Sequence, residues 1–233
     1  MPSRVAFLDL EGTLLRQGID VPGSEHPLSQ WPAIAAALGP EAVAAELATQ
    51  KRWRAGEYSG YLEWVEATCE IHKRFGLTKE IIEKLVKNAQ LMPGAAELVH
   101  YLHNAGFKTT LVTGAVKSFA DRVQSELKIN HSFAACEYFF DSRGRLESWN
   151  TLPCDYKGKM NLMKVVIEEH GVGSQDCVFI GDGENDVPLA KSVGFSVCFN
   201  GHRELRAVST IVIEQPKGTE NLVAVIDELE KHI

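Results

Sequence analysis

Short apolar runs alternate with helical patterns along most of the chain. Four runs end in polar residues or glycine and predict strands: Val5–Leu8, Thr109–Val112, Val178–Ile180 and Phe195–Phe199. Apolar residues at helical spacing predict helices over Ala95–Asn104, Ser118–Leu127, Met160–His170 and Val187–Ser192. Strand alternating with helix is typical of an α/β fold with a parallel sheet covered on both faces, where ligands bind at the carboxyl ends of the strands.

The pattern changes between residues 16 and 90, where no strand-like run occurs. The stretches AIAAALGPEAVAAELATQKRW and YLEWVEATCEIHKRF have helical periodicity, which predicts a helical domain inserted after the first strand. Residues 1–15 and 91–233 then form the Rossmann-like, doubly wound α/β core, and residues 16–90 form the insertion. Residues 133–152 predict a β-hairpin that turns at Arg143-Gly144, as a minor excursion from this core.

Composition narrows the class of protein. The 233 residues are 45% hydrophobic and 24% charged, which suits a globular domain with a sizeable insertion. The net charge of −7 argues against a protein that coats nucleic acid or an anionic membrane and favours a small-molecule substrate. Five cysteines without CxxC spacing predict reduced thiols, and the absence of a leader or a long apolar span predicts a cytoplasmic location.

Acidic residues follow two of the predicted strands. Asp9 and Glu11 stand in FLDLEGTL, and Asp182 and Asp186 stand in VFIGDGENDVPLA. Alternation along a strand places Asp9 and Glu11 on one side, whereas Asp186 alone could simply cap a helix. If the two strands are neighbours, carboxylates roughly 4 Å apart repel by about 4 kcal/mol at an effective dielectric constant of ~20, so a cation is expected. An all-oxygen ligand set favours Mg²⁺ over zinc.

Two further segments offer contacts for a phosphate. TTLVTGAVKS ends a predicted strand at Thr113-Gly114, which provides a hydroxyl and a backbone N–H at the start of the next helix. A threonine that caps the helix is an equally good explanation of this motif alone. CDYKGKMNLM places Lys157 and Lys159 before another helix, and either lysine could contact phosphate, although lysines are usually solvated.

The order of these motifs resembles the haloacid dehalogenase superfamily, over residues 4–15 and 92–200. The helical insertion lies where the phosphoserine phosphatase branch of that superfamily has its cap domain. The matching residues are Asp9, Glu11 and Thr13 in the first motif, Thr113 with Gly114, Lys157, and Asp182, Asn185 and Asp186 in the last.

The resemblance implies a role for each matched residue. Asp9 would be the nucleophile that forms an aspartyl-phosphate, and Glu11 the general acid and base. Thr113, Gly114 and Lys157 would bind the phosphoryl group. Mg²⁺ would be bound by Asp9, the backbone carbonyl of Glu11, Asp182 and Asp186. Glu11 departs from the family, in which aspartate is commoner at this position, and the extra methylene shifts the reach of the acid by more than about 1 Å.

The resemblance predicts a Mg²⁺-dependent phosphatase for a small phosphorylated metabolite, with a phosphoserine-like substrate possible. Transfer of the phosphoryl group to another alcohol is the alternative, whereas Asp9 and Lys157 argue against an inactive binding protein. The usual amino-acid clamp positions fall near Gly18 and Ala67, which cannot serve. The oligomeric state stays open. Nearby basic residues are candidates for a displaced clamp: Arg16, Arg52, Arg54, Lys73 and Arg74.

Overall fold

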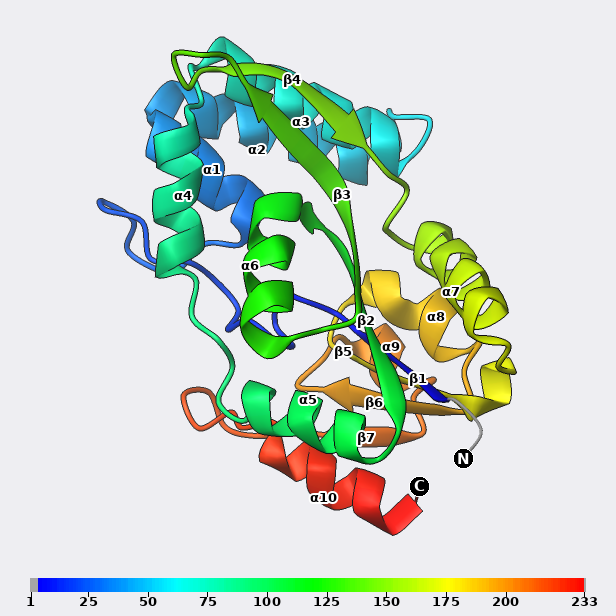
Figure 1. Cartoon of the computed structure of the whole chain (residues 1–233). Helices are drawn as coiled ribbons and strands as arrows, with labels where there is room; N and C mark the ends of the chain where they lie inside the picture. Colours follow the sequence, from blue (N-terminus) through cyan, green and yellow to red (C-terminus); the bar gives the residue numbers. More distant parts are fainter. Residues whose placement is uncertain (1–3, 233) are drawn as a thin grey trace.

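The computed structural model describes residues 4–232, and within this range seven strands form one sheet in the order β4-β3-β2-β1-β5-β6-β7 (Figure 1). All neighbouring strands are parallel except β3 and β4. The predicted α/β fold is therefore confirmed, with one antiparallel strand added at an edge. The strands are β1 (Arg4–Leu8), β2 (Phe107–Val116), β3 (His131–Phe140), β4 (Leu146–Thr151), β5 (Cys177–Gly181), β6 (Phe195–Phe199) and β7 (Ile211–Ile213).

Helices connect the strands and cover both faces of the sheet. Two elements, α5 and β6, have the predicted bounds, and the other predicted elements differ at one or both ends; β7, α9 and α10 were not predicted. None of the helices within residues 4–232 is both long and apolar enough to cross a bilayer. The helices are α1 (Gln30–Leu38), α2 (Pro40–Arg54), α3 (Tyr61–Arg74), α4 (Lys79–Asn88), α5 (Ala95–Asn104), α6 (Lys117–Leu127), α7 (Lys157–His170), α8 (Val187–Ala190), α9 (Arg203–Arg206) and α10 (Val223–His232).

The central strand β1 is buried on both faces, which explains its unbroken apolar sequence. Ala6 and Leu8 belong to one hydrophobic cluster, which includes residues of α5 and α6. Val5 and Phe7 belong to a second cluster, which includes residues of α7 and α8. Packing against both faces therefore fixes the position of the carboxyl end of β1.

The inserted helices α1–α4 lie between β1 and β2 in the sequence and pack at the carboxyl end of the sheet (Figure 1). The predicted hairpin 133–152 is present as β3 and β4, but it is not a minor excursion. Its strand β3 pairs with β2 in the main sheet, and Trp149 on β4 donates a 2.6 Å hydrogen bond to Glu66 of α3. Tyr138 and Leu146 are buried in the same cluster as the inserted helices, and this burial anchors the hairpin. The assignment of residues 16–90 to a separate domain stays a prediction.

Candidate active site

Three aspartates meet where β1 and β5 end. Ligand oxygens of Asp9, Asp182 and Asp186 all lie within 4.8 Å of one another. The two strands are neighbours in register, and the Asp9 amide continues the ladder by donating to the Ile180 carbonyl at 3.0 Å. The structure thus brings together the acids that follow two separate strands in the sequence.

Gly12 allows the chain to pass directly beside Asp182. Its φ angle is +84°, and a Cβ atom there would lie 2.2 Å from a carboxylate oxygen of Asp182. The next residue, Thr13, donates a 3.2 Å hydrogen bond from its hydroxyl to Asp182. A side chain at position 12 would therefore displace the aspartate, so the glycine in the first motif has a steric cause.

The lysine in the acidic cluster is Lys159, not Lys157. The Lys159 ammonium is fully buried and lies 2.6 Å from Asp9 Oδ1 and 2.5 Å from Asp186 Oδ1. Lys157 is the first residue of α7 and is exposed. The cause is helical phase, because Lys159 lies on the same face as the buried Met163 and Val166, four and seven residues later. That spacing was the sequence signal that separates the two lysines.

The cluster has an excess of negative charge. Burial raises the pKa of Asp9 to about 7, with Asp186 adding to the shift and Lys159 opposing it. Burial, then Asp9 and Asp186, also raise the pKa of Asp182 well above its usual range. For Lys159, burial lowers the pKa, but Asp186 and Asp9 outweigh it and the net shift is upward. One ammonium does not balance three carboxylates, and the all-oxygen donor set fits a hard divalent cation such as Mg²⁺.

Glu11 lies beside this cluster and under the first inserted helix. Its Oε2 accepts a 3.3 Å hydrogen bond from the backbone N–H of Gln30, at the start of α1. Its Oε1 is buried and has no partner within residues 4–232. Burial raises the pKa of Glu11 to about 7, with Asp9 adding to the shift. A carboxyl group with this pKa is partly protonated near neutrality, which suits a general acid.

Thr113 and Gly114 lie within β2, near its end, and not at the start of the following helix as predicted. The strand continues to Val116 with an irregular register after Thr113, and α6 begins only at Lys117. Gly114 therefore lies in the irregular end of a strand and not at a helix N-terminus, which corrects its predicted location; phosphate binding by this segment stays a prediction. Thr113 is buried, and its hydroxyl accepts a 3.3 Å hydrogen bond from the Ala115 amide.

Two polar side chains from distant segments, Tyr61 and Asp155, lie beside Gly114. A Cβ atom at Gly114 would lie 3.0 Å from the Tyr61 hydroxyl and 3.2 Å from the Asp155 carboxylate. Tyr61, on α3, donates a hydrogen bond to the Gly114 carbonyl. Asp155 accepts a hydrogen bond from the Asn185 side chain, and burial raises its pKa to about 6. These contacts join segments far apart in the sequence, so no local pattern predicts them.

The inserted helices contribute a group of side chains that reaches Glu11 and Gly114 through Gln30 and Tyr61. We call this group the roof, and it is formed by Gln30, Trp31, Tyr61 and Trp64. The ring centroids of Trp31 and Trp64 are 5.9 Å apart, and those of Tyr61 and Trp64 are 5.5 Å apart. Trp64 Nε1 and both side-chain polar atoms of Gln30 are buried without a hydrogen-bond partner within residues 4–232. The roof therefore combines packed aromatic rings with buried polar atoms that have no partner within residues 4–232.

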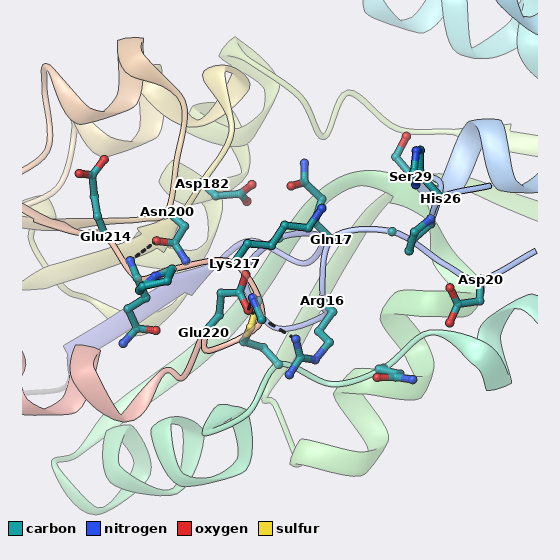
Figure 2. A pocket seen from close by; sticks show the side chains of 18 of the residues that line it. Arg16, Gln17, Asp20, His26, Ser29, Asp182, Asn200, Glu214, Lys217 and Glu220 are labelled. Atoms are coloured by element: carbon teal, nitrogen blue, oxygen red, sulfur yellow. Dashed lines mark hydrogen bonds and ion pairs between the residues drawn. The ribbon is translucent and has the colours of Figure 1, made fainter. Parts of the chain in front are cut away.

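A cavity of about 1070 Å³ adjoins the cluster at Gly12 and Asp182. It lies between the loop after β1 and the loop after β7, and Figure 2 shows Arg16 of the first loop directed toward Glu220 of the second, 3.5 Å away. This volume is large enough for a small metabolite. Other residues along it are Gln17, Asp20, His26, Asn200 and Lys217.

The structure separates the candidates for a displaced clamp. Arg16 lines the cavity beside Asp182. Arg52 is exposed, pairs with Glu57 at 3.0 Å and lines a different groove, which also contains Ala67. Pro27 occupies the space beside Gly18, where a Cβ atom would lie 2.6 Å from the Pro27 Cβ. Arg16, one of the candidate basic residues, and Gly18, one of the two approximate clamp positions, both line the cavity next to the acidic cluster.

Comparisons with known proteins identify the family of this chain. The model of the haloacid dehalogenase-like hydrolase family matches residues 4–194. Phosphoserine phosphatase from Archaeoglobus fulgidus is 28% identical over 173 residues, which cover 73% of this chain and 48% of that protein. The one from Haemophilus influenzae is 28% identical over 62% of this chain and 46% of its own length, so the chain spans about half the length of these two relatives.

A relative from a Polaromonas species is covered more completely. That phosphoserine phosphatase is 28% identical over 165 residues, which cover 69% of each protein. Among solved structures, a phospho-aspartyl intermediate analogue of phosphoserine phosphatase superposes with a TM-score of 0.78 at 19% identity, covering 98% of this chain and 99% of that chain. The structural likeness supports the fold.

Proposed function

Because the chain belongs to the haloacid dehalogenase-like hydrolase family, we propose that it hydrolyses a small phosphomonoester through a phosphorylated Asp9. The observation that carries this proposal is the cluster of Asp9, Asp182 and Asp186 with the buried Lys159 at the carboxyl ends of β1 and β5. The similarity to phosphoserine phosphatases supports a phosphatase within the family.

In the first step, an Asp9 carboxylate oxygen attacks phosphorus and the bond to the leaving alcohol breaks. Glu11 gives its proton to that alcohol, which the raised pKa of Glu11 permits near neutrality. In the second step, Glu11 takes a proton from water, and the resulting hydroxide attacks phosphorus and releases Asp9. One carboxyl group thus serves as acid and then as base.

The phosphoryl oxygens need positive charge and hydrogen-bond donors in the transition state. Lys159 contacts Asp9 directly and supplies the charge. Thr113 and the Gly114 backbone supply donors from the end of β2. Asp155 lies beside Gly114 and accepts a hydrogen bond from the Asn185 amide, which orients Asn185 as a further donor.

The three clustered carboxylates, with the backbone carbonyl of Glu11, would bind Mg²⁺. The bound cation would supply charge that stabilises the phosphoryl oxygens and offsets repulsion among the aspartates. The fit of these residues to a hard cation rests on their all-oxygen donors and on the raised pKa values of Asp9 and Asp182.

The test is release of inorganic phosphate from a panel of sugar, polyol and amino-acid phosphates, with Mg²⁺ and with excess chelator. We expect turnover of at least one monoester, loss of turnover with chelator, and recovery when Mg²⁺ is added back. Full activity in chelator would contradict the metal role, and phosphate captured by added glycerol instead of water would show that the enzyme is a phosphotransferase.

The same panel addresses substrate preference. Gly18 and Ala67 cannot pair an ammonium and a carboxylate, and Arg16 is already engaged with Glu220. We therefore propose that phosphoserine is not strongly preferred, because selectivity requires such buried polar contacts. A preference in kcat/KM above about a hundredfold, some 2.7 kcal/mol, would show that an amino-acid clamp exists elsewhere.

A further inference from the structure

A second group of metal-ligating side chains lies at the other end of α7. His170 and Glu169 end this helix, and His131 begins β3. The two imidazole Nε2 atoms are 2.9 Å apart, and a Glu169 oxygen lies within 4.8 Å of the histidine ring nitrogens in the same group. Both histidines are half-buried and Glu169 is exposed.

Two explanations of this contact differ in what lies between the nitrogens. In a direct hydrogen bond, one imidazole donates and the other accepts, and Glu169 has no part. When both nitrogens bind one cation at about 2.05 Å, they lie roughly 2.9 Å apart at a right angle and roughly 3.3 Å apart at a tetrahedral angle. The second explanation uses all three side chains.

We propose that His131, Glu169 and His170 bind a divalent transition-metal cation of the Zn²⁺ type. Two imidazoles and one carboxylate are a ligand set that zinc uses, whereas Mg²⁺ prefers oxygen ligands alone. The last turn of a helix also attracts positive charge, because its carbonyl groups are unpaired. Water completes the coordination at this half-exposed position.

This site is separate from the acidic cluster. Lys159 and His170 lie 11 residues apart on α7, or about 16 Å along the helix axis. The acidic cluster contains oxygen ligands, and the second group contains nitrogen ligands. A cation at the second group joins the end of α7 to the start of β3, and its effect is on stability instead of on the reacting atoms.

The first experiment is calorimetric titration with Zn²⁺ in saturating Mg²⁺, which keeps the acidic cluster occupied. The wild type should bind Zn²⁺ at one equivalent, and His131→Gln and His170→Gln should each weaken this binding at least tenfold. His100→Gln, which changes a histidine on α5, is the matched control and should behave as wild type. Zn²⁺ binding that is equal in all four proteins, or absent from the wild type, would overturn the proposal and leave a hydrogen-bonded histidine pair.

A spectroscopic arm identifies the ligands directly. Electron paramagnetic resonance of added Cu²⁺ in saturating Mg²⁺ should show hyperfine coupling to imidazole nitrogen in the wild type and in Asp182→Asn. His131→Gln combined with His170→Gln should lose that coupling. Nitrogen coupling that persists in the double variant would place the metal elsewhere and contradict the assignment, whatever the outcome of the phosphatase assays.

Discussion

The two sides of the candidate active site have contrasting chemistry. The floor, formed by Asp9, Asp182, Asp186 and Lys159 at the strand ends, is densely charged. The roof, which comes from the inserted helices, presents aromatic rings and an amide. Phosphoryl transfer needs charge placed around phosphorus, whereas discrimination among alcohols depends on the shape and hydrogen bonds of the opposite wall.

This contrast separates chemistry from specificity. A floor substitution should slow the reaction of every substrate. A roof substitution should change the ranking of substrates and leave the reaction itself intact. Glu11 is a boundary case, because it follows β1 on the floor but accepts a hydrogen bond from Gln30 of the roof.

The largest effect is expected for Asp9→Asn. An amide cannot act as the nucleophile, so turnover should fall by roughly 10⁴-fold or more on every substrate, as for other lost nucleophiles. Steady-state kinetics with several phosphomonoesters measure this loss, and circular dichroism checks the fold. Activity within tenfold of wild type would rule out Asp9 as the nucleophile.

Glu11→Gln should have an effect that depends on the leaving group. Esters of alkyl alcohols require protonation on departure, whereas an aryl phosphate requires little. We expect the alkyl esters to lose more activity than the aryl ester by the ~10²–10⁴-fold typical of acid–base catalysis. Equal losses on both types of ester would indicate that Glu11 only positions other groups.

The two lysines of α7 form a matched pair. Lys159→Gln leaves Asp9 and Asp186 buried without their cation, so we expect roughly 3–5 kcal/mol less stability and a large loss of kcat. Lys157→Gln changes an exposed residue and should stay within about 0.5 kcal/mol of wild type. Chemical denaturation and kinetics measure both variants. Similar behaviour of the two would contradict the placement of Lys159 in the floor.

The smallest effect is expected for Tyr61→Phe on the roof. The variant loses one hydrogen bond, to the Gly114 carbonyl, which corresponds to about 0.5–1.5 kcal/mol. We expect changes of up to about tenfold in kcat/KM that differ among substrates. Tyr101→Phe on α5 is the control. A uniform loss of a thousandfold on all substrates would assign Tyr61 to the chemistry and abolish the contrast with the floor.

The sequence predicted the acids of the floor better than its lysine or the roof, for a physical reason. Asp9 and Asp182 follow apolar strands, and parallel strands bring their carboxyl ends to one edge, so local patterns predict that they meet. Tyr61 and Asp155 reach Gly114 through tertiary contacts between distant segments. Such contacts leave no periodic signal in one sequence.

The errors in the core have similarly local causes. The choice between the two lysines of α7 depended on the helical phase that Lys159 shares with the buried Met163 and Val166, and the resemblance to the family pointed to Lys157 instead. The strand β2 continues through an irregular register after Thr113 to Val116, so Gly114 lies within the strand and not at the start of α6. The edge strand β7 has three residues, too few to show an alternating pattern.

The hydrophobic cluster that supports the roof has a consequence for how the protein unfolds. One contiguous group of buried side chains includes Leu8 and Leu10 below the site, and Trp31, Trp64 and Val65 above it. The inserted helices therefore share a core with the sheet. Separating them exposes apolar surface on both sides, so the inserted helices and the sheet should lose structure together in a single cooperative transition.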